Sequence, residues 1–373
     1  MRDTAARETL RAMGLLREQD GQVWLELTTS GTSAVPRTVV RSLASWEDSF
    51  DHVTRLTGLT AADRVLVPAP PSGSMFAFAH AHAAHLGADV VALDRWSPAA
   101  ATEAVRTCTA AHLTPAMLAT LLDRGLGDVR TVVCAGASLP ESTRREADKA
   151  GAWVVDYYGA AELSFVAMRA GERLEPFPEV DLEIREGVIW ARSPWLADGY
   201  ARGQSGPLHR DDDGFATVGD LGRWDHGSGL VVVGRGDDVV TTGGATVVCA
   251  DVEAALLSLP GVTAAVVVGT PHPGLGEVVE AVVVGIPHPG VGEVVEAFGV
   301  GTDPDTADVD ATDVDATLPG ITHVREAAAH LLDRTQLPRR WHAWADLPLT
   351  AAGKVDRAEV RARILASRAE VTT

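Results

Sequence analysis

Cysteine is scarce in this sequence, and its three cysteines, Cys108, Cys134 and Cys249, lie far apart. An odd number of scattered cysteines favours neither a disulfide framework nor a zinc cluster. No run reaches the roughly 18 apolar residues of a membrane span, and the N-terminus has no apolar core of a secretory signal. These absences predict a soluble, cytoplasmic protein without a membrane partner.

Positive charge is also in short supply. The chain has 32 Lys and Arg against 51 Asp and Glu, which gives a net charge of −19. Such an excess argues against nucleic acid as a partner, because the phosphate backbone attracts basic surfaces. It leaves open a nucleotide site, which can be locally basic. With 373 residues, 46% of them hydrophobic, the chain is long enough for two domains and a sizeable core.

Apolar runs alternate with alanine-rich stretches in the first part of the chain. Residues 64–68 and 88–93 read as strands, and the segments between them read as helices, a pattern typical of α/β folds. Charged and apolar residues mixed over 5–17 predict an amphipathic helix packed on the surface.

A hydroxyl- and glycine-rich loop, Thr-Ser-Gly-Thr-Ser-Ala-Val-Pro-Arg at 29–37, follows the apolar stretch 23–27. Backbone N–H groups and hydroxyls of such a loop can surround a phosphate, although similar runs are often plain turns. It is not the loop of the common nucleoside triphosphatases, because Pro36-Arg37 stands where they need Lys-Ser or Lys-Thr. The candidate phosphate ligands are Thr29, Ser30, Gly31, Thr32, Ser33 and Arg37.

Three later segments suit the same chemistry. Residues 154–162 place a β-branched strand before an aromatic that can stack on adenine, a glycine that admits the nucleotide, and Glu162, which can hold Mg²⁺. In 218–253, Asp220 can accept both ribose hydroxyls and Arg235 can reach ribose or phosphate. In 346–357, Lys354 can stabilise charge at the α-phosphate. Taken singly, these segments read as a strand and turn, a hairpin with charged edges and a solvated loop.

Taken together and in this order, the four segments resemble the adenylate-forming (AMP-binding) superfamily over most of residues 23–365. The short length resembles the o-succinylbenzoate–CoA ligases, which are short acyl/aryl-CoA synthetases. The resemblance implies an α/β fold with a large N-terminal domain, truncated at its N-terminus, and a small α+β C-terminal domain. The resemblance implies a large domain at 1–234 that binds ATP and the acid, and a hinge at 235–238 that pivots on Asp237. A small mobile domain at 239–373 then carries Lys354.

The resemblance also implies the reaction. A carboxylic acid attacks ATP to give an acyl-adenylate, and coenzyme A then forms a thioester, with Lys354, Glu162 and Arg235 as catalytic residues and Glu162 as the Mg²⁺ ligand. A carrier-protein thiol is the alternative acceptor, and a non-catalytic adenylate-binding or scaffold protein is the alternative function. A partner or a second copy of the chain would cover the face left by the missing N-terminal subdomain.

Further site residues follow from the resemblance alone. The implied nucleotide contacts beyond the loop are Gly136, Ala137, Asp156, Tyr157, Tyr158, Gly159, Asp220 and Arg235. The implied acid pocket holds Ser72, Ser74, Phe76, His80 and Ala135. Most departures from the family pattern lie on the phosphate side, where Ala34, Arg37, Ala161 and Val218 replace Gly, Lys, Thr and Thr. Two hydroxyls are lost, and each loss is worth up to about tenfold in rate, which predicts a weakened rather than a dead enzyme.

Three histidines, His80, His82 and His85, suggest either a metal site or a helix that lines the acid pocket. On a helix His80 and His82 point apart, and no nearby carboxylate completes a ligand set, so the pocket helix is favoured.

Residues 265–280 are repeated almost verbatim at 281–296, which indicates a 16-residue tandem duplication within a strand-turn-strand. The extra copy must add a hairpin or loop out. An acidic repeat at 308–317 predicts a mobile insert, and it lacks the glycine and glutamate of an EF-hand calcium loop.

Overall fold

The computed structural model describes residues 3–19, 21–29, 37–234, 239–243, 245–285, 297–299, 319–350 and 353–371. The chain forms two compact units, Met1–Val232 with Thr350–Lys354, and Val233–Leu349 with Val355–Thr373. The division falls two residues before the end of the large domain expected from the sequence, and the expected hinge at 235–238 lies outside the described residues. The domain bounds expected from the motifs place 350–354 in the small domain, whereas the structure groups this segment with the first unit.

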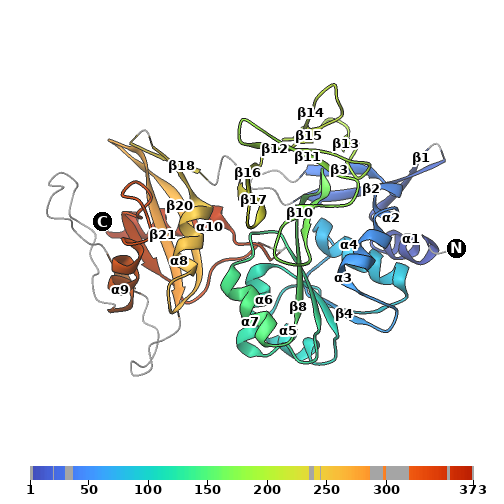
Figure 1. The fold of residues 1–373 in the computed structure, drawn as a ribbon, viewed down its shortest axis with the longest axis horizontal. Coiled ribbons are helices and arrows are strands. Elements are labelled where there is room, and N and C mark those ends of the chain that lie inside the picture. Colours follow the sequence, from blue (N-terminus) through green and yellow to red (C-terminus); the bar gives the residue numbers. More distant parts are fainter. Residues whose placement is uncertain are drawn as a thin grey trace. The chain divides into compact units, whose positions relative to one another are not determined.

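A seven-stranded sheet forms the centre of the first unit (Figure 1). Its strand order is β10-β9-β8-β7-β6-β4-β5, with β5, β4, β6, β7 and β8 parallel and β9 and β10 antiparallel. The strands are β4 (Arg64–Val67), β5 (Asp89–Ala92), β6 (Ala110–Leu113), β7 (Thr131–Ala135), β8 (Trp153–Ala160), β9 (Ser164–Arg169) and β10 (Glu175–Pro176).

The parallel strands are apolar because helices cover them. Every residue of β6 and β7 is buried, as expected for central parallel strands with both faces packed. Helices α5, α6 and α7 lie next to one another along one side of the sheet (Figure 1). The helices of this unit are α1 (Asp3–Ala12), α2 (Ala44–Glu47), α3 (Phe50–Thr57), α4 (Ser74–Leu86), α5 (Pro98–Val105), α6 (Pro115–Arg124) and α7 (Glu141–Lys149).

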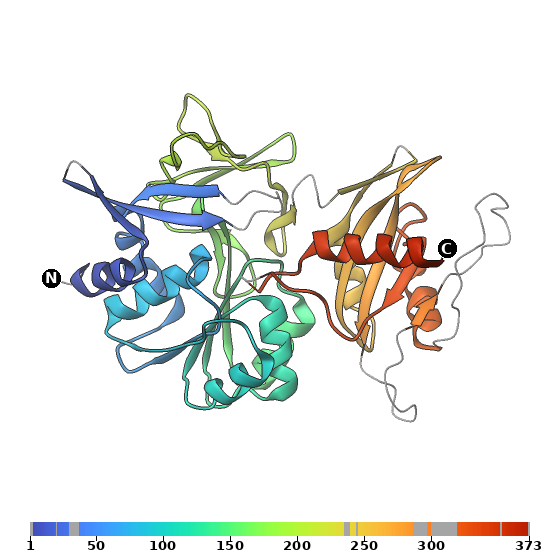
Figure 2. The same cartoon turned by 180° about the vertical axis from the view of Figure 1, so that it is seen from behind.

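Two smaller antiparallel sheets complete the first unit, and they can be followed in Figure 2. One has the order β1-β2-β3-β13, and the other has the order β14-β15-β12-β16-β17 with β11 paired to β12. Their strands are β1 (Leu16–Gln19), β2 (Gln22–Thr29), β3 (Arg37–Ser42), β11 (Asp181–Arg185), β12 (Val188–Arg192), β13 (Gly199–Tyr200), β14 (His209–Arg210), β15 (Ala216–Thr217), β16 (Leu221–Asp225) and β17 (Gly229–Gly234).

The helix expected over 5–17 was too long. Helix α1 ends at Ala12, and Gly14 takes a left-handed conformation with φ of 72°. The Leu15 N–H then donates to the Leu10 carbonyl at 3.1 Å, which is the bond that closes a helix at a glycine C-cap. Residues from Leu16 onwards are therefore free to pair as β1 with β2.

The second unit is a sheet covered on both faces by helices. Its order is β19-β18-β21-β23-β22, with β20 paired to β21. Val266, Val268 and Val282 pack against α10, whereas the alternate residues Val267 and Ala281 lie in the core that contains α8 and α9 residues. The elements are β18 (Val239–Thr242), β19 (Ala245–Val248), α8 (Cys249–Leu257), β20 (Val262–His272), β21 (Gly276–Gly285), β22 (Ala297–Gly299), α9 (Pro319–Ala328), β23 (Arg340–Ala343) and α10 (Arg357–Val371).

The duplicated segment contributes to two neighbouring strands. The first copy, 265–280, forms the hairpin of β20 and β21, with His272 opposite Gly276. β21 then continues through residues 281–285 of the second copy, so that Ala265 pairs with Val283. The rest of the second copy and the acidic repeat lie outside the described residues.

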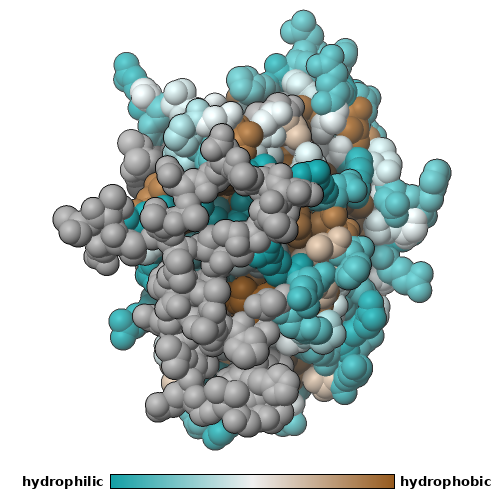
Figure 3. Space-filling model, turned by 90° about the vertical axis from the view of Figure 1, so that its left-hand side faces the viewer, coloured by the Kyte–Doolittle hydropathy of each residue, from teal (hydrophilic) through white to brown (hydrophobic). Residues whose placement is uncertain are grey.

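The face drawn in Figure 3 is mainly hydrophilic over its described atoms, with apolar residues visible only in small separate areas. Among the helices of the described ranges, none is long and apolar enough to cross a membrane.

Candidate nucleotide and acid site

The carboxyl ends of three parallel strands bring the central predicted residues together. Leu113 of β6 pairs with Cys134 of β7, and Ala135 of β7 pairs with Tyr157 of β8. The residues that follow each strand therefore lie side by side at one edge of the sheet. This is the edge at which open α/β sheets bind their ligands.

Consecutive tyrosines of β8 have different roles, because strand side chains alternate between faces. Tyr157 packs on Phe165 with ring centroids 4.7 Å apart, and burial raises the pKa of its hydroxyl. Tyr158 is half-buried, and its hydroxyl donates to Asp220 Oδ2 at 2.8 Å. The residues expected at adenine and ribose are thus in direct contact, although they are 62 positions apart.

Position 159 needs a glycine because the backbone of β9 comes very close to it. A Cβ at this position would lie 2.1 Å from the Ser164 carbonyl oxygen, at an irregularity in the β8–β9 pairing. Real Cβ contacts are longer, so a larger residue would push β9 away from β8 and displace the segment that carries Glu162.

Asp156 is engaged by arginines. Arg144 donates to its carboxylate, and the Arg169 guanidinium lies 3.2 Å from it. The Asp156 side chain is buried and these two cations hold it between β8, β9 and α7. We assign Asp156 a packing role on this geometry, and the nucleotide contact expected for it stays a prediction.

Glu162 is buried, and two residues that the motifs did not reveal hold it and the backbone just before it. The Tyr200 hydroxyl donates to Glu162 Oε1 at 2.9 Å. Arg41, fully buried, donates to the Ala161 carbonyl at 3.0 Å and to the carbonyl of Trp195. Burial lowers the pKa of Arg41 to about 9, against the opposing effect of Asp198 and Glu162, so the guanidinium remains charged at neutral pH.

The ends of the predicted phosphate loop meet this carboxylate region. Thr29 pairs with Arg37 across β2 and β3, and Tyr200 of β13 pairs with Val39. Burial and Glu162 raise the pKa of Tyr200, and Arg37 lies close enough to oppose them. Ser30, Gly31, Thr32 and Ser33 lie outside the described residues.

Lys354 lies beside the end of β7, within the first unit. A Cβ added to Gly136, whose φ is 97°, would lie 3.0 Å from Lys354 Cε and 3.7 Å from the Thr114 methyl group. The Thr114 hydroxyl donates to the Gly353 carbonyl at 2.8 Å. The structure thus brings the expected catalytic lysine to the same strand ends as Gly136.

Comparison with known proteins finds relatives by sequence and by fold. The family model described as AMP-binding enzyme matches residues 19–201. The uncharacterized acyl–CoA ligase YhfT of Bacillus subtilis is 27% identical over 89% of this chain and 67% of its own length. The 2-succinylbenzoate–CoA ligase of Bacillus licheniformis is 26% identical over 67% of this chain and 57% of its own length.

Residues 19–201 of this chain form an AMP-binding domain, as the resemblance to the adenylate-forming family implies. The crystal structure of ATP-bound MatB from Rhodopseudomonas palustris matches 91% of this chain and 67% of that chain, with a TM-score of 0.71 at 23% identity, which shows the fold. The family and the α/β fold class expected from the motifs are confirmed. The chain spans 57–67% of the length of these three proteins.

The acid-pocket candidates differ in exposure. Phe76 and Ala135 are buried, Ser74 is half-buried, and Ser72 is exposed. His80 is buried on α4, and burial lowers the pKa of its imidazole. No described contact joins these five residues into one site, so the pocket stays a prediction.

The histidines of α4 behave as packed side chains. His82 Nε2 lies 2.9 Å from Thr54 Oγ1, and the His82 and His85 rings stack at 6.4 Å. Burial lowers the pKa of His82 to about 3, and that of His112 on β6 to about 3 as well. Over the described ranges, no group of three or more potential metal ligands is present.

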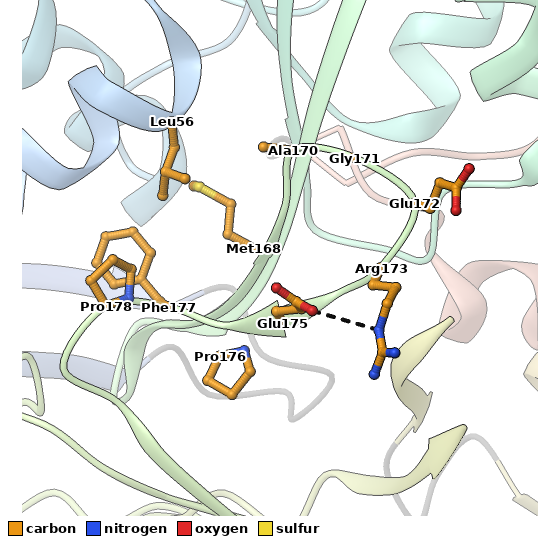
Figure 4. Close-up of a pocket in the computed structure, with 10 residues that line it drawn as sticks. All are labelled: Leu56, Met168, Ala170, Gly171, Glu172, Arg173, Glu175, Pro176, Phe177 and Pro178. Atoms are coloured by element: carbon orange, nitrogen blue, oxygen red, sulfur yellow. Dashed lines mark ion pairs between the residues drawn. The ribbon is translucent and has the colours of Figure 1, made fainter. Parts of the chain in front are cut away.

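A hollow of about 430 Å³ lies on a different part of the first unit (Figure 4). Apolar residues of α3, β9 and β10 line it, and Arg173 and Glu175 pair at 3.5 Å at its rim. It contains none of the residues expected in the nucleotide or acid site.

Two further motif residues meet in the second unit. Arg357 donates to both carboxylate oxygens of Glu253, at 2.6 and 2.8 Å, and also to the Val267 carbonyl. This paired geometry ties the start of α10 to α8 and β20. Arg235 and Asp237 lie outside the described residues, and their roles stay predictions.

The side chains at the site suit the groups that the family uses. Mg²⁺ prefers oxygen ligands, and a carboxylate has about four lone-pair directions, of which the Tyr200 hydroxyl uses one at Glu162. Ala137 is exposed next to Gly136, after the end of β7.

Proposed function

We propose that this protein activates a small carboxylic acid with ATP and transfers the acyl group to coenzyme A. A carboxylate oxygen attacks the α-phosphorus, the bond to pyrophosphate breaks, and an acyl-adenylate forms. The thiol sulfur then attacks the acyl carbon, its proton leaves, and AMP departs with the oxygen. The observation that supports this most is the contact of Tyr158 with Asp220 in the unit that also holds Glu162 and Lys354.

Each residue has a role that follows from its chemistry. Asp220 accepts hydrogen bonds from the ribose hydroxyls, and Tyr158 both supports Asp220 and offers a ring face to adenine. Lys354 supplies a positive charge where negative charge grows on the α-phosphate. Glu162 would hold Mg²⁺, which would offset the charge of the phosphates.

The departures from the family pattern are compatible with activity. Arg37 keeps the positive charge of the usual lysine. Ala161 lacks the usual hydroxyl, but its carbonyl accepts from the buried Arg41 and so keeps the backbone before Glu162 in place. We expect slow turnover rather than none. We propose that the reaction occurs in the cytoplasm, where both ATP and coenzyme A are present.

The test is pyrophosphate release from ATP and Mg²⁺ over a panel of aryl and acyl acids. We expect release with at least one acid, and a fall of about 10²- to 10³-fold in Lys354→Ala, because a preorganised charge at the transition state is lost. Lys149→Ala is the matched control, since Lys149 ends α7 on the surface, and it should behave as the wild type.

The acceptor is tested next. Thioester formation with free coenzyme A supports the acyl–CoA ligase, whereas formation only with a phosphopantetheine-bearing carrier protein supports the alternative acceptor. AMP binding without pyrophosphate release from any acid would overturn catalysis and favour the adenylate-binding homologue.

A further inference from the structure

Thr114 lies between β6 and α6 and uses both hydrogen-bonding capacities of its hydroxyl. As the N-cap of α6 it accepts from the Met117 N–H at 3.3 Å. It also donates to the Gly353 carbonyl at 2.8 Å, across 239 positions of sequence. The side chain is 1% exposed, so water does not compete for either bond.

Two glycines near this hydroxyl allow the segment that carries Lys354 to pack closely against it. Gly353 has a φ of 71°, and a Cβ there would lie 2.0 Å from Met117 Cε. A Cβ at Gly136 would lie 3.0 Å from Lys354 Cε. Both atoms are the flexible ends of side chains, so a larger residue at Gly353 or Gly136 would require Met117 or Lys354 to shift, and the positive φ of both glycines also disfavours a side chain there.

The segment itself is a closed turn. The Thr350 N–H donates to the Lys354 carbonyl at 2.7 Å, and the Gly353 N–H donates to the Thr350 carbonyl at 2.8 Å. The Lys354 N–H also lies 3.2 Å from Thr350 Oγ1. Because the turn is also held internally, the bond from Thr114 to the Gly353 carbonyl anchors the backbone next to Lys354.

We propose that Thr114 is a positioning residue for adenylation, which holds Lys354 at the strand ends through the Gly353 carbonyl. This rests on the proposed function, in which Lys354 acts on the α-phosphate. A cap needs only the oxygen lone pair of Thr114, so the hydroxyl proton is available for this second task.

Activity gives the first test. Thr114→Val keeps the shape but removes the hydroxyl, and Thr114→Ser keeps the hydroxyl. We expect Thr114→Val to lower acid-dependent pyrophosphate release between about twofold and about tenfold, the range for one lost hydrogen bond, mostly in kcat. Thr114→Ser should restore it. Thioester formation from supplied acyl-adenylate, which does not need Lys354 at the α-phosphate, should be unchanged in both variants.

Proteolysis gives a test that needs no activity. The chain has only two lysines, Lys149 and Lys354, so a lysine-specific protease can cut at two places. Cleavage tracks the population in which a segment has opened. We expect Thr114→Val to be cut after Lys354 about two to ten times faster than the wild type, with cleavage after Lys149 as the internal reference.

Ser97→Ala is the control for the effect of losing a helix cap alone. Ser97 caps α5 through a bond from the Ala100 N–H at 3.4 Å and has no part in the site. This variant should match the wild type in cleavage after Lys354 and in pyrophosphate release.

Two results would overturn the proposal. One is cleavage after Lys354 that is no faster in Thr114→Val than in Ser97→Ala. The other is an equal fall of pyrophosphate release and thioester formation, which marks a general loss of structure. If the wild type releases no pyrophosphate with any acid, the proposed function fails, but the cleavage experiment still decides whether Thr114 holds the segment.

Discussion

Glu280 is a fully buried carboxylate of β21 that is held by four side chains. Thr270 and Arg368 donate to it, Arg340 lies 3.3 Å from Oε1, and His342 Nε2 lies 3.0 Å from Oε2. Burial alone would raise the pKa of Glu280, but the hydrogen bonds from His342, Arg368 and Thr270 lower it to about 2. The charged carboxylate is therefore part of the folded structure of the second unit.

The pH dependence of stability follows from this pKa. A carboxyl whose pKa is lower when folded stabilises the protein above its unfolded pKa, and this contribution is lost as the pH falls towards the folded value. We expect Glu280→Gln to reduce the free energy of unfolding by about 3–5 kcal/mol at pH 7, because it leaves the half-buried guanidinium groups of Arg340 and Arg368 without their charged partner. The difference from the wild type should shrink from about pH 5 to about pH 2.

Urea denaturation at pH 7, 5, 4 and 3 measures this difference. Glu359→Gln is the control, because Glu359 forms an exposed pair with Arg363 on α10, and such pairs contribute little. A constant gap between Glu280→Gln and the wild type over this range would show that the Glu280 charge does not stabilise the fold.

Residues with a motif were easier to predict than residues that support them. Tyr158 and Asp220 were assigned to one site because their residue types carry the chemistry, and their side chains are in contact. Arg41 and Tyr200 hold the Glu162 region, but they lie 120 and 38 positions from their partners. Nothing in the local sequence marks them, because their role depends on how β3 and β13 pair.

At the scale of elements, the duplicated hairpin offers a matched pair of deletions. Removal of 265–280 or of 281–296 leaves chains that differ at only two positions, Thr270 against Ile286 and Leu275 against Val291. In both, Ala297 follows the retained glutamate directly. The comparison therefore tests the Thr270 hydroxyl, which donates to the buried Glu280, together with a leucine-to-valine change at the half-buried position 275.

We expect the chain that retains Thr270 to be more stable. The isoleucine of the other chain cannot donate to the carboxylate, which costs on the order of 1–2 kcal/mol for a hydrogen bond to a charged group. Urea denaturation of the two deletion variants measures this difference. If the two variants were equally stable, or if the variant with isoleucine were the more stable, the Thr270 hydroxyl would not stabilise the fold.

The limits of sequence patterns are clearest in two elements. Three strands were predicted because each contains an apolar or β-branched run, and β4, β5 and β8 fall where expected. The helix over 5–17 was placed wrongly beyond Ala12, since its apolar spacing continued past Gly14. A hydrophobic period does not mark a helix end when a single backbone conformation at a glycine decides it.

For the whole molecule, each unit has its own apolar core, so each should have its own unfolding transition. Residues of β8, β9 and α4 form cores in the first unit, and Val267, Ala281 and Trp341 belong to a core in the second. Chains with several domains often depart from a single two-state transition. We therefore expect calorimetry to resolve two heat absorption peaks.

AMP and Glu280→Gln should act on different peaks. Tyr158, Asp220 and Lys354, which we propose contact the nucleotide, belong to the first unit, so AMP at 100 times its dissociation constant should stabilise that unit by about 2.7 kcal/mol. Glu280→Gln should lower the other peak alone. Asp220→Asn is the control that weakens the shift with AMP, because a ribose acceptor loses its charge. If AMP raised the peak that Glu280→Gln lowers, the nucleotide site could not be confined to the first unit.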